Sequence, residues 1–197
     1  SYLVRMVKEL TRKMKDSGIE WIGEIPEDWE ITKLKNVLFD KVEKNDSDNP
    51  IVLSLARAGI KVRDISNNEG QLAESYLNYN KVSYGDLLLN PMDLISGANC
   101  NISEVEGVIS PAYFNLNPID NNNIYYYGYY FKLQYWNMVL FTHGKGVSFE
   151  NRWTLNRETL LNYYLPVPPI SKQKAITNFL DKKTQEIDNI ISKTKKA

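Results

Sequence analysis

Residues 165–197 read LPVPPISKQKAITNFLDKKTQEIDNIISKTKKA, and this stretch decides how the rest of the chain is interpreted. It begins with three prolines between Leu165 and Ile170, which exclude helix and push their neighbours into extended geometry. A new element is therefore expected after Ile170, with the Ser171 hydroxyl as its N-cap. No glycine or proline follows, so the sequence predicts one helix that continues to Ala197.

The helix expected over residues 171–197 carries one apolar stripe, whose members recur at steps of three and four residues. The residues expected to form a partner interface are Ile176, Leu180, Ile187, Ile190 and Ile191. The seam is coiled-coil-like, although Lys183 and Thr194 interrupt it. Packing on the chain's own domain remains open as an alternative. We favour docking against another chain, because the stripe continues after the prolines have closed the globular part.

Composition indicates a globular protein with an appended element, since 43% of the 197 residues are apolar. No run approaches the ~20 apolar residues of a membrane span, and the N-terminus lacks a signal-peptide core. We therefore expect a cytoplasmic protein without membrane contact. One cysteine, Cys100, and one histidine, His143, exclude a disulfide framework and a Cys/His zinc site. We expect neither a metal nor a cofactor.

The charge is zero overall but unevenly distributed, since residues 1–15 and 171–197 are each strongly basic. The body between them is therefore acidic, which argues against indiscriminate polyanion binding and leaves local basic clusters as candidate nucleic-acid contacts. The first cluster contains Arg57, Lys61 and Arg63. The second lies between residues 121 and 157 and contains Lys132, Lys145, Arg152 and Arg157 against one acid, Glu150.

From the N-terminus to the C-terminus, the sequence predicts a mixed α/β (α+β) fold with three parts. Residues 1–15 are expected to form a short amphipathic helix or tail. Residues 16–168 are expected to form a β-rich domain with short helices, and residues 169–197 the long coiled-coil-like helix. Within the domain, we expect irregular chain over residues 15–31 with Trp21 and Trp29 as packing anchors. We also expect a helix or helix-strand transition over 33–42, a loop over 45–50 and a weak helix over 72–79.

Short apolar runs bounded by turn residues predict the strands of this domain. They lie at residues 51–55, 87–90, 102, 108–109 and 113–116. Gly59 allows a tight turn after the first of them, which would bring the basic residues on either side close together. Leu155 to Leu165 is expected to run as a short helix and a strand into the prolines.

Residues 124–141, IYYYGYYFKLQYWNMVLF, are the most aromatic part of the chain. A platform for stacking unpaired bases is one interpretation, because aromatic faces stack on bases. A core helix is the interpretation that we favour. Its predicted core-facing residues, spaced along one side, are Tyr129, Leu133, Trp136, Val139 and Leu140.

The sequence carries no recognisable catalytic motif. A glycine-rich strand-to-helix turn and a GxxxxGK[ST] loop are both absent. The tetrapeptide 90–93 (NPMD) departs at its last two positions from the Asn-Pro-Pro-aromatic motif of DNA amino-methyltransferases, so we interpret it as structural. His143 has no serine partner in a strained turn, and we interpret Cys100 as a small buried hydrophobe. We expect a non-catalytic protein.

The chain resembles the specificity subunit of type I restriction-modification systems, in particular one target recognition domain followed by one spacer helix. Four stretches carry the resemblance: KDSGIEWIGEIPEDW (15–29), GDLLLN (85–90) with VISPAY (108–113), GKGVSFENRWTL (144–155) and PVPPISKQKAITNFLDKKTQEIDNII (166–191). Members commonly carry two recognition domains and two helices, whereas this chain has one of each.

The resemblance implies a subunit that reads double-stranded DNA for methyltransferase (modification) subunits, which hold S-adenosylmethionine, and possibly for a restriction subunit. Each recognition domain reads one half of a two-part site, and the helices set the distance between the halves. The chain would then be a half subunit that forms a homodimer through residues 169–197, or part of a longer subunit. The 27 residues from Ser171 extend about 40 Å as a helix, close to the roughly 34 Å of one DNA turn.

We expect DNA contacts from the first basic cluster and from the glycine-flanked loop over residues 142–148 with its continuation. The candidate contacts are Arg57, Lys61, Arg63, Lys145, Ser148, Asn151 and Arg152. Arginine bonds guanine bidentately and asparagine does so with adenine, while lysine mostly steadies phosphates. The alternative is an interaction scaffold that holds methyltransferase subunits without binding DNA itself.

Overall fold

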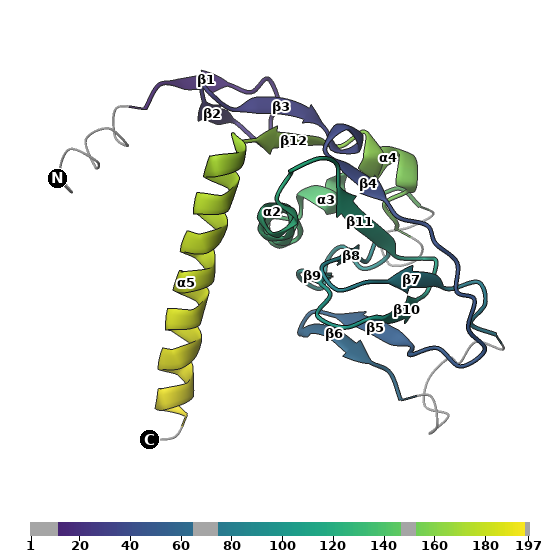
Figure 1. Cartoon of the computed structure of the whole chain (residues 1–197). Helices are drawn as coiled ribbons and strands as arrows, with labels where there is room; N and C mark the ends of the chain where they lie inside the picture. The colour runs from purple at the N-terminus through teal and green to yellow at the C-terminus, as the bar shows by residue number, and fades with distance from the viewer. Residues whose placement is uncertain (1–11, 65–74, 147–152, 196–197) are drawn as a thin grey trace.

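A β-rich domain followed by one long helix makes up the computed structural model, which describes residues 12–64, 75–146 and 153–195 (Figure 1). The strands are β1 (Met14–Asp16), β2 (Glu24–Pro26), β3 (Glu30–Lys33), β4 (Leu38–Asp40), β5 (Leu53–Ala56), β6 (Gly59–Val62), β7 (Asn80–Val82), β8 (Leu87–Leu89), β9 (Cys100–Ile102), β10 (Gly107–Ile109), β11 (Phe114–Pro118) and β12 (Tyr164–Val167). The helices are the 3-10 turn η1 (Leu34–Asn36), α2 (Ile124–Trp136), α3 (Val139–Thr142), α4 (Arg157–Leu161) and α5 (Ile170–Thr194). The predicted mixed α/β class is confirmed.

A four-stranded antiparallel sheet in the order β4-β11-β8-β9 forms the centre of the domain. All three residues of β8 are fully buried. Because side chains alternate across a strand, Leu87 and Leu89 belong to the main core while Leu88 belongs to a smaller cluster on the other face. That smaller cluster is completed by Leu53, Leu55, Val82 and Ile109. The apolar run at residues 87–90 is thus a strand buried on both faces, as predicted.

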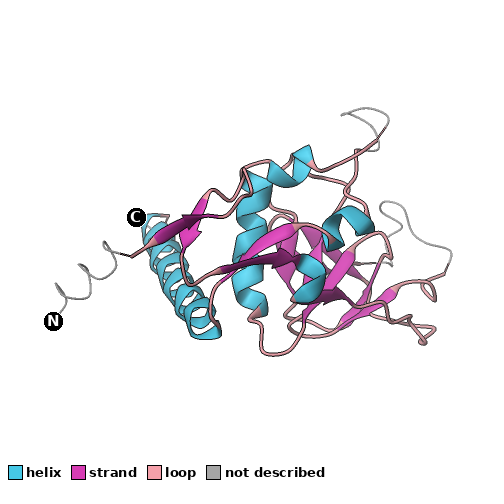
Figure 2. Ribbon diagram, turned by 90° about the horizontal axis from the view of Figure 1, so that it is seen from above, coloured by secondary structure: helices cyan, strands magenta, loops and turns pink. Residues whose placement is uncertain are grey.

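Helix α2 covers the main face of the sheet and lies between the sheet and α5 (Figure 1, Figure 2). The side chains of Tyr127, Phe131 and Tyr135 are fully buried in the main core. Gly128 lets α2 come close to β9, because a Cβ atom there would lie 3.2 Å from Cδ1 of Ile102. The prediction of a core helix in this aromatic stretch is confirmed.

The predicted core-facing side of α2 is wrong at most of its positions. Leu133 is 50% exposed and Trp136 is 60% exposed, while Tyr129 and Val139 are half-buried. Only Leu140, in α3, is fully buried among those five residues. The helix buries the opposite side, because the tyrosines and phenylalanine there pack against the sheet.

The N-terminal part of the described chain is more regular than predicted. Strands β1 and β2 form an antiparallel hairpin in which Met14 pairs with Pro26, so residues 14–15 are extended and not helical. Residues 1–11 of the predicted helix lie outside the described residues. Trp21 stacks on Tyr163 with ring centroids 5.4 Å apart, which confirms its role as a packing anchor.

Several other local predictions are confirmed, and one is wrong. The helix-strand transition over 33–42 is confirmed as η1 followed by β4, and the short helix and strand after Leu155 are confirmed as α4 and β12. Residues 75–79 form a turn and not a weak helix, while residues 72–74 lie outside the described part. The basic run folds as predicted into a hairpin of β5 and β6, with Gly59 at a φ of 126° in its turn.

Helix α5 begins where the prolines end. Strand β12 pairs with β3 through Pro166 and Val167, opposite Ile31 and Glu30. The N-cap is Pro169, which makes no side-chain cap, so the prediction of Ser171 as the cap is wrong. Within the described residues, no helix combines the length and the apolar character that a membrane span requires.

Candidate nucleic-acid interface

The hairpin of β5 and β6 presents the first basic cluster at the surface. Lys61 lies on β6 opposite Ser54, is exposed, and has no acidic partner among the residues that the structure describes. Arg63 follows the hairpin and is half-buried, with its backbone N–H donated to the carbonyl of Val52 at 2.7 Å. Arg57 is exposed in the turn. The hairpin carries all three residues, but its register spreads them along its length, from Arg57 in the turn to Arg63 at the far end beside Val52, so the predicted close approach is wrong.

A loop over residues 90–98 connects this hairpin to the second basic region. Arg57 donates a hydrogen bond from Nη1 to the carbonyl of Ser96 at 2.7 Å. At the other end of the loop, the backbone N–H of Leu155 donates to the carbonyl of Pro91 at 3.0 Å. Leu94 also packs so closely on Gly144 that a Cβ there would lie 3.2 Å from Cδ1 of Leu94. The loop is therefore the physical link between the two predicted contact regions.

The NPMD tetrapeptide forms the start of this linking loop. Oδ1 of Asn90 accepts the backbone N–H of Met92 at 2.9 Å, and Asp93 accepts hydrogen bonds from Ser96 and Asn99. These are turn-stabilising contacts. They agree with the interpretation of the tetrapeptide as structural.

The second basic region is described only in part. Lys145 is exposed, and its backbone N–H and C=O pair with those of Thr154 at 2.9 and 3.0 Å. Ser148, Asn151 and Arg152 lie outside the described residues. The structure therefore places Lys145 beside the linking loop, and the other three candidates of this region stay predictions.

A groove between the domain and α5 was not predicted from the sequence. It measures about 510 Å³ and runs between α2, the linking loop and the middle of α5. Its lining residues are Arg57, Ser96, Gly97, Ala98, Tyr129, Lys132, Trp136 and Thr184. The ammonium of Lys132 lies over the ring of Tyr129, 5.9 Å from its centroid. Cationic side chains beside aromatic rings are a combination that grooves for single-stranded nucleic acid use.

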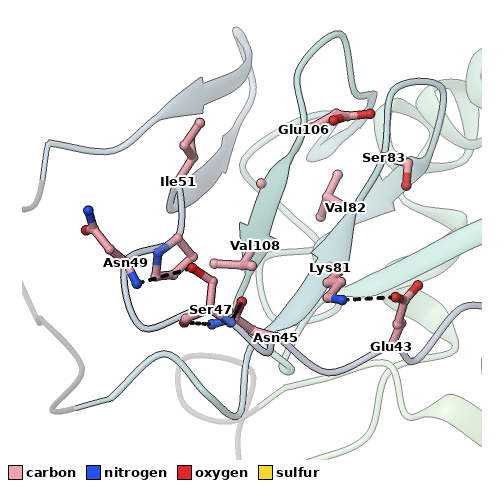
Figure 3. Close-up of a pocket in the computed structure, with 12 residues that line it drawn as sticks. Glu43, Asn45, Ser47, Asn49, Ile51, Lys81, Val82, Ser83, Glu106 and Val108 are labelled. Carbon is pink, nitrogen blue, oxygen red and sulfur yellow. Dashed lines mark hydrogen bonds and ion pairs between the residues drawn. The ribbon is translucent and has the colours of Figure 1, made fainter.

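A second hollow, on the far side of the hairpin, has the opposite character (Figure 3). It measures about 430 Å³ and is lined by residues of the loop before β5 and of β7 and β10. Lys81 is neutralised there by Glu43 at 3.3 Å and Asp46 at 2.9 Å, and Glu106 adds a further acid. A phosphate backbone would meet net negative charge in this hollow.

The single cysteine and the single histidine of the chain are both packed inside the domain. Cys100 is fully buried, and burial raises the pKa of its thiol to about 12, so the nucleophilic thiolate is suppressed. The Nδ1 atom of His143 lies 2.8 Å from the carbonyl of Val139, and its ring packs edge-on against Trp21 and Tyr163. Across the described residues, no group of three or more His, Cys, Asp or Glu side chains is placed to hold a metal ion.

The stripe on α5 is divided between two environments. Ile176 is half-buried against the main core and Leu180 is half-buried beside it. Ile187 and Ile190 are 55% and 64% exposed, and Ile191 is exposed as well. The beginning of the stripe therefore packs on its own domain, and docking of its uncovered continuation against another chain stays a prediction.

A family model described as the type I restriction modification DNA specificity domain matches residues 26–197. The chain belongs to this family. The match covers the chain from the end of β2 through α5, so the resemblance predicted from the sequence is confirmed.

Solved structures of specificity subunits share the fold of this specificity domain. The HsdS subunit from Thermoanaerobacter tengcongensis is 16% identical with a TM-score of 0.55, over 89% of this chain and 41% of that one. The S subunit of a type I restriction-modification system from M. genitalium is 12% identical with a TM-score of 0.53, over 83% and 41%.

A third structure comes from work on complex assembly and conformational transition of a type I restriction-modification system. It is 16% identical with a TM-score of 0.57, over 94% of this chain and 44% of that one. The specificity domain thus spans about two fifths of the length of each of these chains.

Proposed function

We propose that this specificity domain reads one half of a bipartite double-stranded DNA site and docks methyltransferase subunits on the assembly. Membership of the family over residues 26–197 is the observation that carries this proposal. The chain acts as a reader without catalysis of its own, and the methyl donor would be held by the methyltransferase subunits. A restriction subunit is a further partner of the same complex.

The proposed DNA contacts are centred on the hairpin of β5 and β6. Lys61 is exposed and lacks an acidic partner among the described residues, whereas the chain as a whole is neutral with an acidic body. Arg57 joins the hairpin to the linking loop, and Lys145 lies at the other end of that loop. Ser148, Asn151 and Arg152 complete the proposed contact set from the sequence. Arginine and asparagine would read base edges, and lysine would hold phosphates.

Helix α5 has two different faces, which supports pairing with a second helix. Successive residues turn by about 100° around a helix. Gln173, Thr177 and Asp181 therefore share a polar face, which is turned toward the chain's own α2. The apolar seam lies roughly 90° away from that face, and it consists of Ile176, Phe179, Leu180, Ile187, Ile190 and Ile191. The contact between α5 and its own domain thus leaves most of the seam available to a second helix.

The partner that we propose for the seam is the same helix of a second copy, or the second half of a longer subunit. A helix of 25 residues is about 37 Å long, close to the roughly 34 Å of a DNA turn, so paired helices would hold two readers about one turn apart. Two identical readers related by a two-fold axis would bind an interrupted palindrome, because the symmetry of the protein imposes that of the site.

The test compares two strand lysines that differ in their pairing, Lys61 on β6 and Lys81 on β7. Lys61→Ala removes an exposed charge from the proposed interface, so DNA affinity should fall and the slope of log affinity against log salt should shrink by about 1. Lys81→Ala is the matched control, since Glu43 and Asp46 already neutralise that lysine. Binding would be measured on duplexes selected from a random pool in the presence of the methyltransferase partner.

Two results would contradict the DNA-reading proposal. Retention on duplex DNA that is insensitive to salt would favour the scaffold alternative, because phosphate contacts release counterions. Equal effects of the Lys61 and Lys81 substitutions would remove the hairpin from the interface.

A further inference from the structure

The first turns of α5 are fixed to the domain through one buried amide side chain. Gln173 is fully buried, and its Oε1 accepts the backbone N–H of Asn123 at 2.8 Å. Its Nε2 donates to the carbonyl of Pro168 at 3.0 Å and to Oδ1 of Asn122 at 3.3 Å. One side chain therefore ties α5 to the residues that lead into α2 and to the prolines that precede α5 itself.

Two further contacts continue along the same face of α5 at steps of four residues. The buried hydroxyl of Thr177 donates a hydrogen bond to the carbonyl of Gln173 at 3.0 Å and accepts one from Nδ2 of Asn123 at 3.4 Å. One turn later, the phenolic hydroxyl of Tyr129 donates to Asp181 at 2.7 Å. The attachment thus extends over about 12 Å of the helix axis.

Polar contacts of this kind constrain direction in a way that an apolar contact does not. Burial of apolar surface is non-directional, so a helix held by Ile176 alone would remain free to tilt over the domain. Hydrogen bonds weaken steeply away from linear geometry. A buried amide that loses its partners is also costly. Gln173 therefore favours one angle between α5 and α2.

The length of α5 makes that angle important. Over about 37 Å, a tilt of about 5° moves the far end of the helix by about 3 Å. That movement is across the helix axis, but the same rotation moves a point about 37 Å to the side of α5 by about 3 Å along the axis, nearly one base-pair step of roughly 3.4 Å. An attachment that is loose by a few degrees would therefore shift the outer part of a reader along the axis by up to about one base pair.

We propose that Gln173 is a positioning residue that sets the spacing between the two half-sites by fixing the angle of α5 to its reader. Thr177 and the Tyr129–Asp181 pair assist it. The spacing role rests on the proposed function, in which paired α5 helices hold two readers. The fixed angle itself is a property of the single chain.

The angle is tested by the distance between spin labels on the reader and on the far part of α5. Cysteines would replace Glu104 and Ser192, both exposed, and labelled chains would be diluted with unlabelled ones; the native Cys100 is buried. The wild-type background should give one narrow distance distribution. Gln173→Met keeps the side-chain size but removes the hydrogen bonds, so the width should grow roughly twofold as the helix tilts by about 5° either way.

Two more variants keep this measurement decisive. Lys174→Met places the same side chain at the adjoining exposed position and should leave the distribution narrow. Tyr129→Phe removes only the hydroxyl that bonds Asp181, so it should broaden the distribution without disturbing the buried amide, even if Gln173→Met does not fold. Equal widths for the wild type and Tyr129→Phe, or for Lys174→Met and a folded Gln173→Met, would overturn the inference.

The spacing is tested with duplexes that carry two randomised half-sites at separations that differ by single base pairs, bound in the presence of the methyltransferase partner. The wild type should enrich one separation, whereas Gln173→Met should enrich the same half-site sequences at two or three adjacent separations, roughly one base pair for each 3 Å of added freedom. If the wild type enriches no separation, the proposed function fails. If Gln173→Met keeps the single wild-type separation, the function stands and the inference fails.

Discussion

The two halves of α5 both carry part of the apolar stripe, but they have different surroundings. In the first half, Gln173 and Thr177 are buried and Ile176 and Leu180 are half-buried. From Asp181 to Lys195, every residue is exposed, including three isoleucines. The apolar stripe runs through both halves, although Lys183 interrupts it, and the reach of α2 beside the helix changes between them (Figure 1). An apolar stripe therefore shows that a helix has something to bury, but not what covers it.

The largest effect is expected from placing charge in the uncovered half. Ile187→Glu combined with Ile190→Glu should weaken association of two chains at least 100-fold, because each buried isoleucine is worth about 1.5–3 kcal/mol and occurs twice in a dimer. Sedimentation at tens of micromolar would measure it, with Gln185→Glu combined with Ser192→Glu, two exposed positions on the opposite side of the helix, as the control. A wild-type chain that sediments as a monomer under these conditions would contradict the proposed pairing.

The two halves should also differ in amide hydrogen exchange. In the Ile187→Glu/Ile190→Glu variant, amides of residues 184–194 should exchange about 10- to 100-fold faster than those of residues 174–181, since only the first half is held by tertiary contacts. In the paired wild type, this difference should become smaller. Uniform protection along α5 in the variant would show that the second half is stable on its own.

A smaller effect is expected from matched truncations of two isoleucines. Ile176→Ala should lower the free energy of unfolding by roughly 1–2 kcal/mol, because that side chain packs partly against the main core. Ile190→Ala should change it by less than about 0.5 kcal/mol in a chain kept monomeric by dilution. Urea unfolding at low protein concentration measures both. Similar losses would mean that the second half also packs on its own domain.

The difference between the halves explains how far the sequence could predict this molecule. The position of α5 followed from the prolines, and the start at Ile170 lies one residue before the predicted one. The anchor could not be predicted, because Gln173 is polar and its partners Asn122 and Asn123 are 50 residues away in the sequence. Periodic apolar residues indicate which side of a helix is buried, whereas a single buried amide side chain produces no such period.

The buried side of α2 was predicted wrongly for a related reason. Almost every residue of IYYYGYYFKLQYW is apolar or aromatic, so no polar side marked which face is exposed. Tyr127, Phe131 and Tyr135 fit a helical period as well as Leu133 and Trp136 do, and only packing against the sheet decides between them. The β1–β2 hairpin was missed because its strands have three residues each. The hairpin at Gly59 was found because a short β-rich run precedes a glycine that allows a tight turn.

The smallest effect is expected from a change of pH. It should alter the stability of the domain that holds the first half of α5 and hardly affect the second half of the helix. Burial raises the pKa of Asp40, outweighing the hydrogen bond from the backbone N–H of Asn115 and the nearby guanidinium of Arg157. Because this pKa is higher in the folded chain, the folded state holds the extra proton. Stability should therefore fall as the pH rises from about 4, the unfolded value, through the folded pKa.

In the second half, the exposed ion pair of Glu186 with Lys183 at 2.7 Å lowers the pKa of Glu186. Its contribution has the opposite sign, since it is lost as the pH falls through the lowered value, and it is small because water screens both charges. Asp40→Asn should flatten the dependence of urea unfolding on pH above about 4, while Glu186→Gln should leave the curve nearly unchanged. A curve that Asp40→Asn leaves as steep as before would place the titrating group elsewhere in the domain.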